Sequence, residues 1–229
     1  MSLTSLRLPQ SDFPMADLVE RIEGTRFLGP EFLVWLWFKA ELFENELALT
    51  DGRSIELWFE KQLTLRGALD SAERIQFTGV DPSKSAEAKL ALRSNKLPQR
   101  ARISLRTDQG EFSFVFDADT FSFGSVKLPA MLGDDAEEKI SKDELQFAST
   151  APKASVPKDA DEQFLERMEL LRTLDELWRL LYAEFLQVRL HEDWEKVLVP
   201  SIVSWSKGKP EFDTRSYGAL LKRANKAMP

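Results

Sequence analysis

Apolar side chains recur every three or four positions along one late segment of the chain. This spacing places them on one continuous face of an α-helix. At roughly 1.5 Å per residue such a helix is about 40 Å long. Its apolar face must pack on a sheet, on another helix or on a second copy of the chain. The face is formed by Phe164, Met168, Leu171, Leu174, Trp178, Leu181, Phe185 and Val188.

A second helix is predicted over residues 29–44, with Pro30 near its first turn. Positions 32–38 are apolar without interruption. A helix that is apolar all round is either buried on most sides or docked on a partner. A buried strand is the competing interpretation for so short a run. A shorter helix, between Pro14 and Gly24, is predicted upstream.

The middle of the chain shows the alternation of β-strands. Residues 54–67 fit a strand or a hairpin, and residues 73–80 fit a strand. Residues 81–96 fit a turn followed by a helix. Two alternating stretches flank Asp108-Gln109-Gly110, which predicts a β-hairpin with a three-residue loop. Residues 120–129 fit one more strand. The predicted fold is α+β, a mainly antiparallel sheet with helices on one face, plus the long C-terminal amphipathic helix.

Composition divides the chain into four parts. Residues 1–132 form the α+β domain with the aromatic helix and the sheet. Residues 133–161 are polar, contain two prolines, and are predicted to be a mobile linker. Residues 162–206 form a helical segment that packs on the sheet or on a dimer mate, and Pro200 interrupts its last helix. Residues 207–229 form a basic, loose tail.

Charge and cysteine content narrow the function classes. The net charge of −7 and the pI near 5.0 argue against a protein that coats nucleic acid with its whole surface, but not against a local basic patch. There are no cysteines, which excludes disulfides and thiolate chemistry and favours a reducing compartment. No apolar run reaches membrane-spanning length and no leader peptide is evident. We expect a cytoplasmic protein with no membrane contact.

Residues that carry catalysis are sparse. His191 is the single histidine, at the expected end of the long helix, where a helix-end role explains it better than catalysis. Asp117 and Asp119 resemble a cation site but fit a strand-terminal turn. Glu87 and Lys89 resemble part of a nuclease site but fall on a predicted helix. We expect no enzyme activity, no metal and no cofactor.

Basic residues are concentrated in residues 84–107. This window holds seven Lys or Arg and one Glu, a net charge of +6, which leaves −13 for the rest of the chain. Lys89, Arg93 and Lys96 have the spacing of one helix face. Aligned with a basic strand face, they would form one cationic surface for DNA phosphates. The strand face is formed by Arg100, Arg102 and Arg106.

Two other interpretations of this window remain open. In the first, the cations are solvated on an exposed sheet face. In the second, they pair with acidic residues of the long helix, which are Glu166, Glu169, Asp175 and Glu176.

The same region resembles a known family. The stretch "SAEAKLALRSNKLPQRARISLRTDQGEFSFVFDADTFSFGSVKLP" is similar to the later half of RdgC-type recombination-associated proteins, although Asn95 stands where many members have Gly. "FLGPEFLVWLWFKAE" and "IELWFEKQLTL" resemble the segment that precedes it there. "FLERMELLRTLDELWRLLYAEFLQVRL" with "DWEKV" resembles the family's terminal helices. The similarity runs from about Phe27 to about Trp205, and the family's N-terminal half has no counterpart in this chain.

The resemblance implies a non-catalytic, nucleoid-associated protein that binds double-stranded DNA without sequence preference. Family members form ring-shaped homodimers around DNA and modulate RecA-mediated recombination. The resemblance therefore implies phosphate contacts at Lys89, Arg93, Lys96, Arg100, Arg102 and Arg106. The alternative is a protein-interaction module that kept the fold and lost DNA binding. It would dock through the aromatic helix or through the stripe of the long helix, and a metal-dependent nuclease is the weakest hypothesis.

Overall fold

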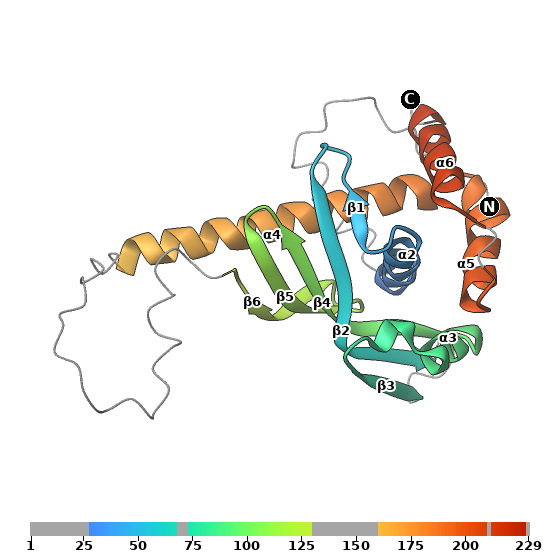
Figure 1. The fold of residues 1–229 in the computed structure, drawn as a ribbon, viewed down its shortest axis with the longest axis horizontal. Helices are drawn as coiled ribbons and strands as arrows, with labels where there is room; N and C mark the ends of the chain where they lie inside the picture. Colours follow the sequence, from blue (N-terminus) through green and yellow to red (C-terminus); the bar gives the residue numbers. More distant parts are fainter. Residues whose placement is uncertain (1–27, 68–72, 130–159, 210–211, 228–229) are drawn as a thin grey trace, which may run out of the picture.

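The structure is a computed structural model that describes residues 28–67, 73–129, 160–209 and 212–227. It confirms the α+β class (Figure 1). The helix expected between Pro14 and Gly24, and the linker expected at 133–161 apart from its last two residues, lie outside the described residues. The strands are β1 Glu46–Ala48, β2 Ser54–Gly67, β3 Arg74–Gly79, β4 Lys96–Thr107, β5 Gly110–Asp117 and β6 Ser122–Lys127. The helices are α2 Gly29–Leu42, η2 Pro82–Lys84, α3 Ala86–Arg93, α4 Ala160–Arg189, a π-helical segment η4 Trp194–Leu198, α5 Val199–Ser206 and α6 Thr214–Ala227.

The six strands form one antiparallel sheet in the order β1-β2-β4-β5-β6. The long strand β2 has two different neighbours on one side. Its first residues pair with β1, and residues 61–66 pair with β3. The pairing of β2 with β4 shifts between Phe59 and Leu63, where Lys61 has a φ of 55°. This bulge bends the sheet, and it separates the part that carries β1 from the part that carries β3.

Alternation along the strands gives the sheet two different faces. Ala101, Ile103 and Leu105 of β4 are fully buried on the inner face, as are the three phenylalanines of β5. Helices α2 and α4 pack on this inner face, as predicted (Figure 1). Trp178 of α4 lies with its ring centroid 4.7 Å from that of Phe116. Thus the apolar stripe of α4 packs on the sheet of its own chain from Leu174 onward.

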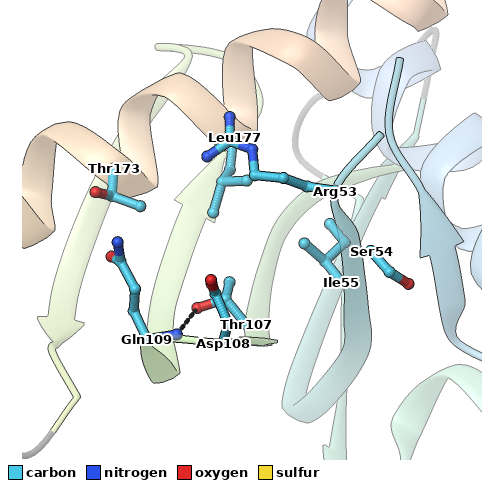
Figure 2. Close-up of a pocket in the computed structure, with 8 residues that line it drawn as sticks. All are labelled: Arg53, Ser54, Ile55, Thr107, Asp108, Gln109, Thr173 and Leu177. Atoms are coloured by element: carbon cyan, nitrogen blue, oxygen red, sulfur yellow. Dashed lines mark hydrogen bonds between the residues drawn. The ribbon is translucent and has the colours of Figure 1, made fainter. Parts of the chain in front are cut away.

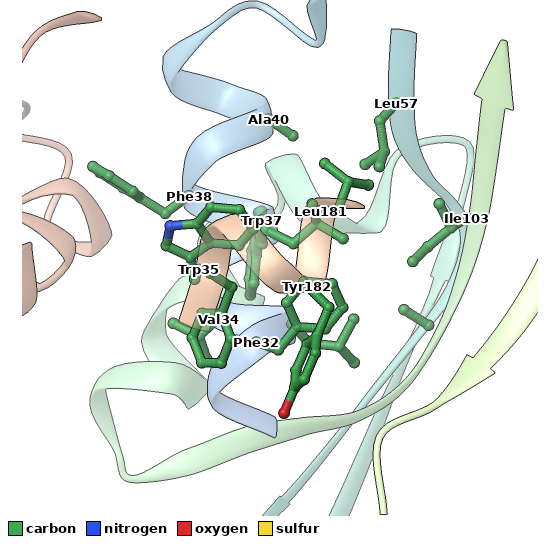
Figure 3. Packing of buried hydrophobic residues seen from close by; sticks show 14 of the residues in the cluster. Phe32, Val34, Trp35, Trp37, Phe38, Ala40, Leu57, Ile103, Leu181 and Tyr182 are labelled. Atoms are coloured by element: carbon green, nitrogen blue, oxygen red, sulfur yellow. The ribbon is translucent and has the colours of Figure 1, made fainter. Parts of the chain in front are cut away.

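Helix α2 is the centre of the core (Figure 3). Its unbroken apolar run is explained by its neighbours, because the sheet covers one side and α4 and α5 cover others. Trp35 and Trp37 are fully buried. The run is therefore a helix and not a strand, and it is buried within the chain and not available to a partner. Its first turn touches the sheet, since a Cβ on Gly29 would lie 2.0 Å from the carbonyl oxygen of Ala118.

A buried polar cluster joins three helices inside this core. Lys39 of α2 donates hydrogen bonds of 2.8 and 2.7 Å to the two carboxylate oxygens of Glu184 on α4. The hydroxyl of Tyr217 on α6 donates to the same carboxylate at 2.8 Å. Burial lowers the pKa of Lys39, and the neighbouring carboxylate opposes that effect. Burial and the same carboxylate raise the pKa of Tyr217 well above its usual value.

The C-terminal residues differ from expectation. Residues 214–227 form α6, where a loose tail was predicted. Tyr217, Leu220 and Ala224 are buried on one side of α6, which contacts α4. The prediction was wrong because the basic residues between these positions dominate the composition, whereas the three buried residues share one helix face.

Candidate functional site

The arginines of β4 lie on the outer face of the sheet, opposite α2 and α4. Arg100, Arg102 and Arg106 alternate with the buried inner-face residues, as the sequence predicted. The side chains of Arg100 and Arg106 are 51% and 53% exposed. Ser104, in the same row, is fully buried, and its hydroxyl has no hydrogen-bond partner within the described residues. The outer-face row of β4 is therefore exposed to solvent at Arg100 and Arg106, and it is buried at Ser104 between them.

Carboxylates on the neighbouring strands neutralise both ends of this row. Arg100 lies directly opposite Asp117 of β5, and their side chains are 2.6 Å apart. Partial burial acts to raise the pKa of Asp117, but hydrogen bonds from Arg100 and from two backbone amides outweigh it, so the pKa is lowered. The carboxylate is therefore charged at neutral pH and compensates the arginine.

Arg106 is held from both sides. Glu56 of β2 lies 3.2 Å away and Glu111 of β5 lies 3.4 Å away. Its guanidinium also lies 5.1 Å from the ring centroid of Trp58. Arg102 donates a long hydrogen bond of 3.4 Å to the Ser113 hydroxyl and has no ion pair among the described residues. Of the three strand arginines, Arg102 alone lacks a carboxylate partner in the described part of the chain.

The other three basic residues do not share one helix face. Lys89 turns towards α2 and α5, where its nitrogen lies 2.6 Å from Glu41 and 4.8 Å from the ring centroid of Trp205. Lys96 belongs to strand β4, is 8% exposed, and pairs with Glu73 at 2.7 Å. Arg93 is exposed at the end of α3.

The expected alignment of these residues with the strand arginines is therefore not found. Lys89 reaches helices on the inner side of the sheet, whereas the strand arginines face outward. Two of the four acidic residues of the long helix named above have partners in that helix itself. Asp175 and Glu176 pair within α4, with Arg179 and Arg172 respectively.

Glu41 is a polar centre that the sequence did not single out. It accepts hydrogen bonds from the indole nitrogens of Trp37 and Trp205, at 2.9 and 2.8 Å, in addition to its pair with Lys89. These contacts join α2, α3 and α5. Because its oxygens are already occupied by three donors, Glu41 stabilises packing and does not act as an open site.

A cavity of about 220 Å³ lies where α4 crosses the open end of the sheet (Figure 2). Polar groups of its lining form hydrogen bonds and ion pairs within the turns that surround it. The hydroxyl of Thr107 accepts from the amide of Gln109 at 3.0 Å, and Arg53 pairs with Asp51 at 2.7 Å. It is lined by Arg53, Ser54, Ile55, Thr107, Asp108, Gln109, Thr173 and Leu177. These residue types include no histidine and no cysteine.

Residues considered for catalysis have structural roles. Asp117 and Asp119 bind arginines and neighbouring polar groups at the end of β5. Glu87 accepts from the Ser85 hydroxyl at the start of α3. His191 follows α4 and accepts the amide hydrogen of Asp193. Within the described ranges, no group of three or more acidic or histidine side chains is arranged to hold a metal ion.

The N-terminal end of α4 carries a feature that the sequence only partly indicated. Its first turns extend past β5 and β6 (Figure 1). Phe164, Leu165, Met168 and Leu171 are 61%, 66%, 49% and 38% exposed. The apolar spacing along the sequence predicted an apolar face on this helix. Only the structure shows that the sheet does not reach the first turns of α4, so this part of the face stays exposed. Among the described helices, none is long and apolar enough to cross a membrane.

Comparison with known proteins identifies no relative. No family model, no curated protein and no solved structure matches the chain.

Proposed function

We propose that this chain is a non-catalytic protein-interaction module that forms a homodimer through the projecting end of α4. The observation that carries the proposal is the exposure of Phe164, Leu165, Met168 and Leu171 on consecutive turns of one helix. Fully burying such a side chain is worth about 1.5–3 kcal/mol relative to leaving it in water. Contiguous exposed apolar side chains on a soluble protein mark a contact surface.

A second copy of the chain fits this surface. Figure 1 shows that the end of α4 extends beyond the sheet. Two such ends could therefore pack side by side in antiparallel orientation without contact between the two sheets. Glu169 and Arg172 flank the apolar stripe on the same side. In an antiparallel pair centred near Leu171, Glu169 of each copy approaches Arg172 of the other. Because Arg172 already pairs with Glu176 within α4, these contacts favour the antiparallel orientation and add little to the affinity.

Sedimentation equilibrium of the full chain tests this proposal. We expect a monomer–dimer equilibrium for the wild type and a monomer for Met168→Glu, because the new carboxylate would be buried without a partner. Val203→Glu is the matched control, since Val203 is 44% exposed on α5, away from the stripe. Circular dichroism checks that both variants are folded. A wild type that stays monomeric at every concentration, or a Met168→Glu variant that dimerises as well as the wild type, contradicts the proposal.

Sequence-independent binding of double-stranded DNA is the second candidate, and nucleoid association would follow from it. The exposed ends of the arginine row on β4 and the resemblance to RdgC-type proteins favour it. The ion pairs of Lys89, Lys96, Arg100 and Arg106 with carboxylates weigh against it. A paired cation must give up its carboxylate before it can bind a phosphate, so each such contact contributes less. We therefore place DNA binding after protein interaction.

A further inference from the structure

The cavity beneath α4 has charged residues of opposite sign in its lining (Figure 2). Arg53 comes from the turn between β1 and β2, and Asp108 comes from the turn between β4 and β5. Ile55 and Leu177, which are 2% and 1% exposed, form its apolar wall. An apolar wall with a few convergent polar groups is typical of small-molecule sites. At about 220 Å³ the cavity is smaller than most drug-sized sites, so its ligand must be small.

The sheet brings the two turns together. Strands β2 and β4 pair side by side as far as Glu56 and Arg106. The turn that precedes β2 and the turn that follows β4 therefore lie next to each other at this end of the sheet. Figure 2 shows the guanidinium of Arg53 next to α4, and the side chains of Asp108 and Gln109 rising towards α4 from the hairpin turn. The cavity lies between these groups.

Several polar groups around the cavity are not used within the protein. The guanidinium of Arg53 binds Asp51 through Nε at 2.7 Å, which leaves its two terminal nitrogens without a hydrogen-bond partner among the described residues. The carboxylate of Asp108 has neither a hydrogen bond nor an ion pair within the described ranges. The side-chain amide of Gln109 is equally free in the part of the chain that the structure describes. These groups can therefore bind a ligand without first giving up a contact.

Arg53 and Asp108 do not neutralise each other, although their turns are adjacent. No ion pair joins these two side chains in the described structure. Water in the space between them would leave the Asp108 carboxylate without a cation. A ligand with one charge of each sign would meet both side chains, and such contacts between charged groups are stronger than those of neutral groups.

The chemistry of the lining selects one class of ligand. The terminal nitrogens of Arg53 match the two oxygens of a carboxylate, and the carboxylate of Asp108 matches an ammonium group. An α-amino acid carries both groups on one carbon atom, whereas two separate ions would each lose their freedom of motion on binding. The apolar wall favours an aliphatic side chain, since contact with Ile55 and Leu177 removes that side chain from water.

We propose that this cavity binds an aliphatic α-amino acid of about the size of leucine. Its carboxylate binds Arg53, its ammonium group binds Asp108, and its side chain packs on Ile55 and Leu177. Asp51 is a positioning residue, because its bond to Nε fixes the guanidinium and leaves the terminal nitrogens for the ligand. The cavity lies within one copy of the chain, so its test does not depend on the proposed homodimer.

Titration of the isotope-labelled full chain with L-leucine, followed by amide correlation NMR, tests the site. We expect saturable shifts of the amide signals of Arg53, Thr107 and Gln109 at about millimolar ligand. Isocaproate lacks the ammonium group of leucine and isoamylamine lacks its carboxylate, so each should bind at least about tenfold more weakly than leucine. Glycine, which lacks the aliphatic side chain, should also bind more weakly than leucine.

Two variants separate the roles of the two charges. Asp108→Asn should bind leucine at least about tenfold more weakly than the wild type and should keep the wild-type affinity for isocaproate. Arg53→Gln should lose leucine affinity to the same extent and should keep the affinity for isoamylamine. Asp108 has no partner in the described part of the chain, so Asp108→Asn should leave the melting temperature unchanged. This variant keeps the test sound if Arg53→Gln, which breaks the pair with Asp51, is less stable.

Three results would overturn the proposal. One is the absence of a saturable shift of these amide signals with leucine at up to about 20 mM. Another is equal affinity of the wild type for leucine, isocaproate and isoamylamine. The third is an Asp108→Asn variant that is folded and binds leucine as tightly as the wild type.

Discussion

The ammonium nitrogen of Lys39 lies 2.7 Å from a carboxylate oxygen of Glu184, although 145 positions separate the two residues. Both residues are 2% exposed. Tyr217 completes the cluster, so α2, α4 and α6 meet at one carboxylate. A buried pair of this kind fixes the relative positions of helices, because each charge is costly without the other.

Removal of one partner should therefore destabilise the protein strongly. Lys39→Met leaves the Glu184 carboxylate buried without its cation, and we expect a loss of about 3–5 kcal/mol in the free energy of unfolding. Urea unfolding measures this loss. The double variant Lys39→Met, Glu184→Leu should recover most of it, since it leaves no uncompensated charge. A double variant as unstable as the single variant would contradict this explanation.

Acid should weaken the link between Arg100 and Asp117. The pKa of Asp117 is below its usual value in the folded protein, so this carboxylate stabilises the fold at pH values above its unfolded pKa. That contribution disappears as the pH falls through the folded pKa, which lies below the ordinary value of 3.8. Urea unfolding from pH 6 to pH 2 should show a smaller loss of stability for Asp117→Asn than for the wild type. Equal pH dependence in the two proteins would exclude this role.

Two glycines should respond oppositely to alanine. Gly29→Ala places a methyl group against the carbonyl of Ala118, and we expect a loss of about 1–3 kcal/mol. Gly218 lies in α6 with nothing within 4 Å of its would-be Cβ. Gly218→Ala should therefore stabilise the protein by about 0.5–1 kcal/mol, because alanine restricts the unfolded chain and favours helix. Thermal unfolding of both variants checks the pair.

Any DNA binding should be weak and should depend little on salt. Arg102 is the strand arginine without a carboxylate partner among the described residues. We therefore expect a slope of log affinity against log salt no steeper than about −2, since each phosphate contact contributes about −0.9. Fluorescence anisotropy with a 30-base-pair duplex measures the slope. Tight binding with a steep slope, lost in an Arg100→Glu, Arg102→Glu, Arg106→Glu variant, would instead establish the basic row as the interface.

The sequence predicted most of the strands and helices of the described region. Alternation gave the bounds of β2 at Ser54–Gly67, and the unbroken apolar run was recognised as a helix. These predictions succeeded because periodicity reports burial, and burial here follows from one sheet face and one group of helices. The inner-face position of Ile103 and its neighbours followed in the same way.

The ion pairs depend on the strand register and on helix packing, and the periodicity of the sequence reports neither of these. The hairpin has Asp108 and Gln109 as its turn, with Thr107 opposite Gly110. The three-residue loop that the sequence predicted would shift the register by one position. Because a shift of one residue moves a side chain to the other face, the Arg100–Asp117 pair could not be foreseen. The contact of Lys89 with Glu41 depends on how α3 packs on α2, which no local pattern reports.

The central position of α2 has a consequence for synthesis of the protein. Its rings rest on partners that come much later in the chain, such as Phe185, whose ring centroid lies 5.7 Å from that of Trp35. At about 5–20 residues per second, a ribosome needs roughly 7–30 s to travel from the end of α2 to Phe185. During this interval the most aromatic segment of the molecule has left the ribosome before its cover exists. The burial of α2 seen in the structure can therefore be completed only after α4 and α5 have been synthesised.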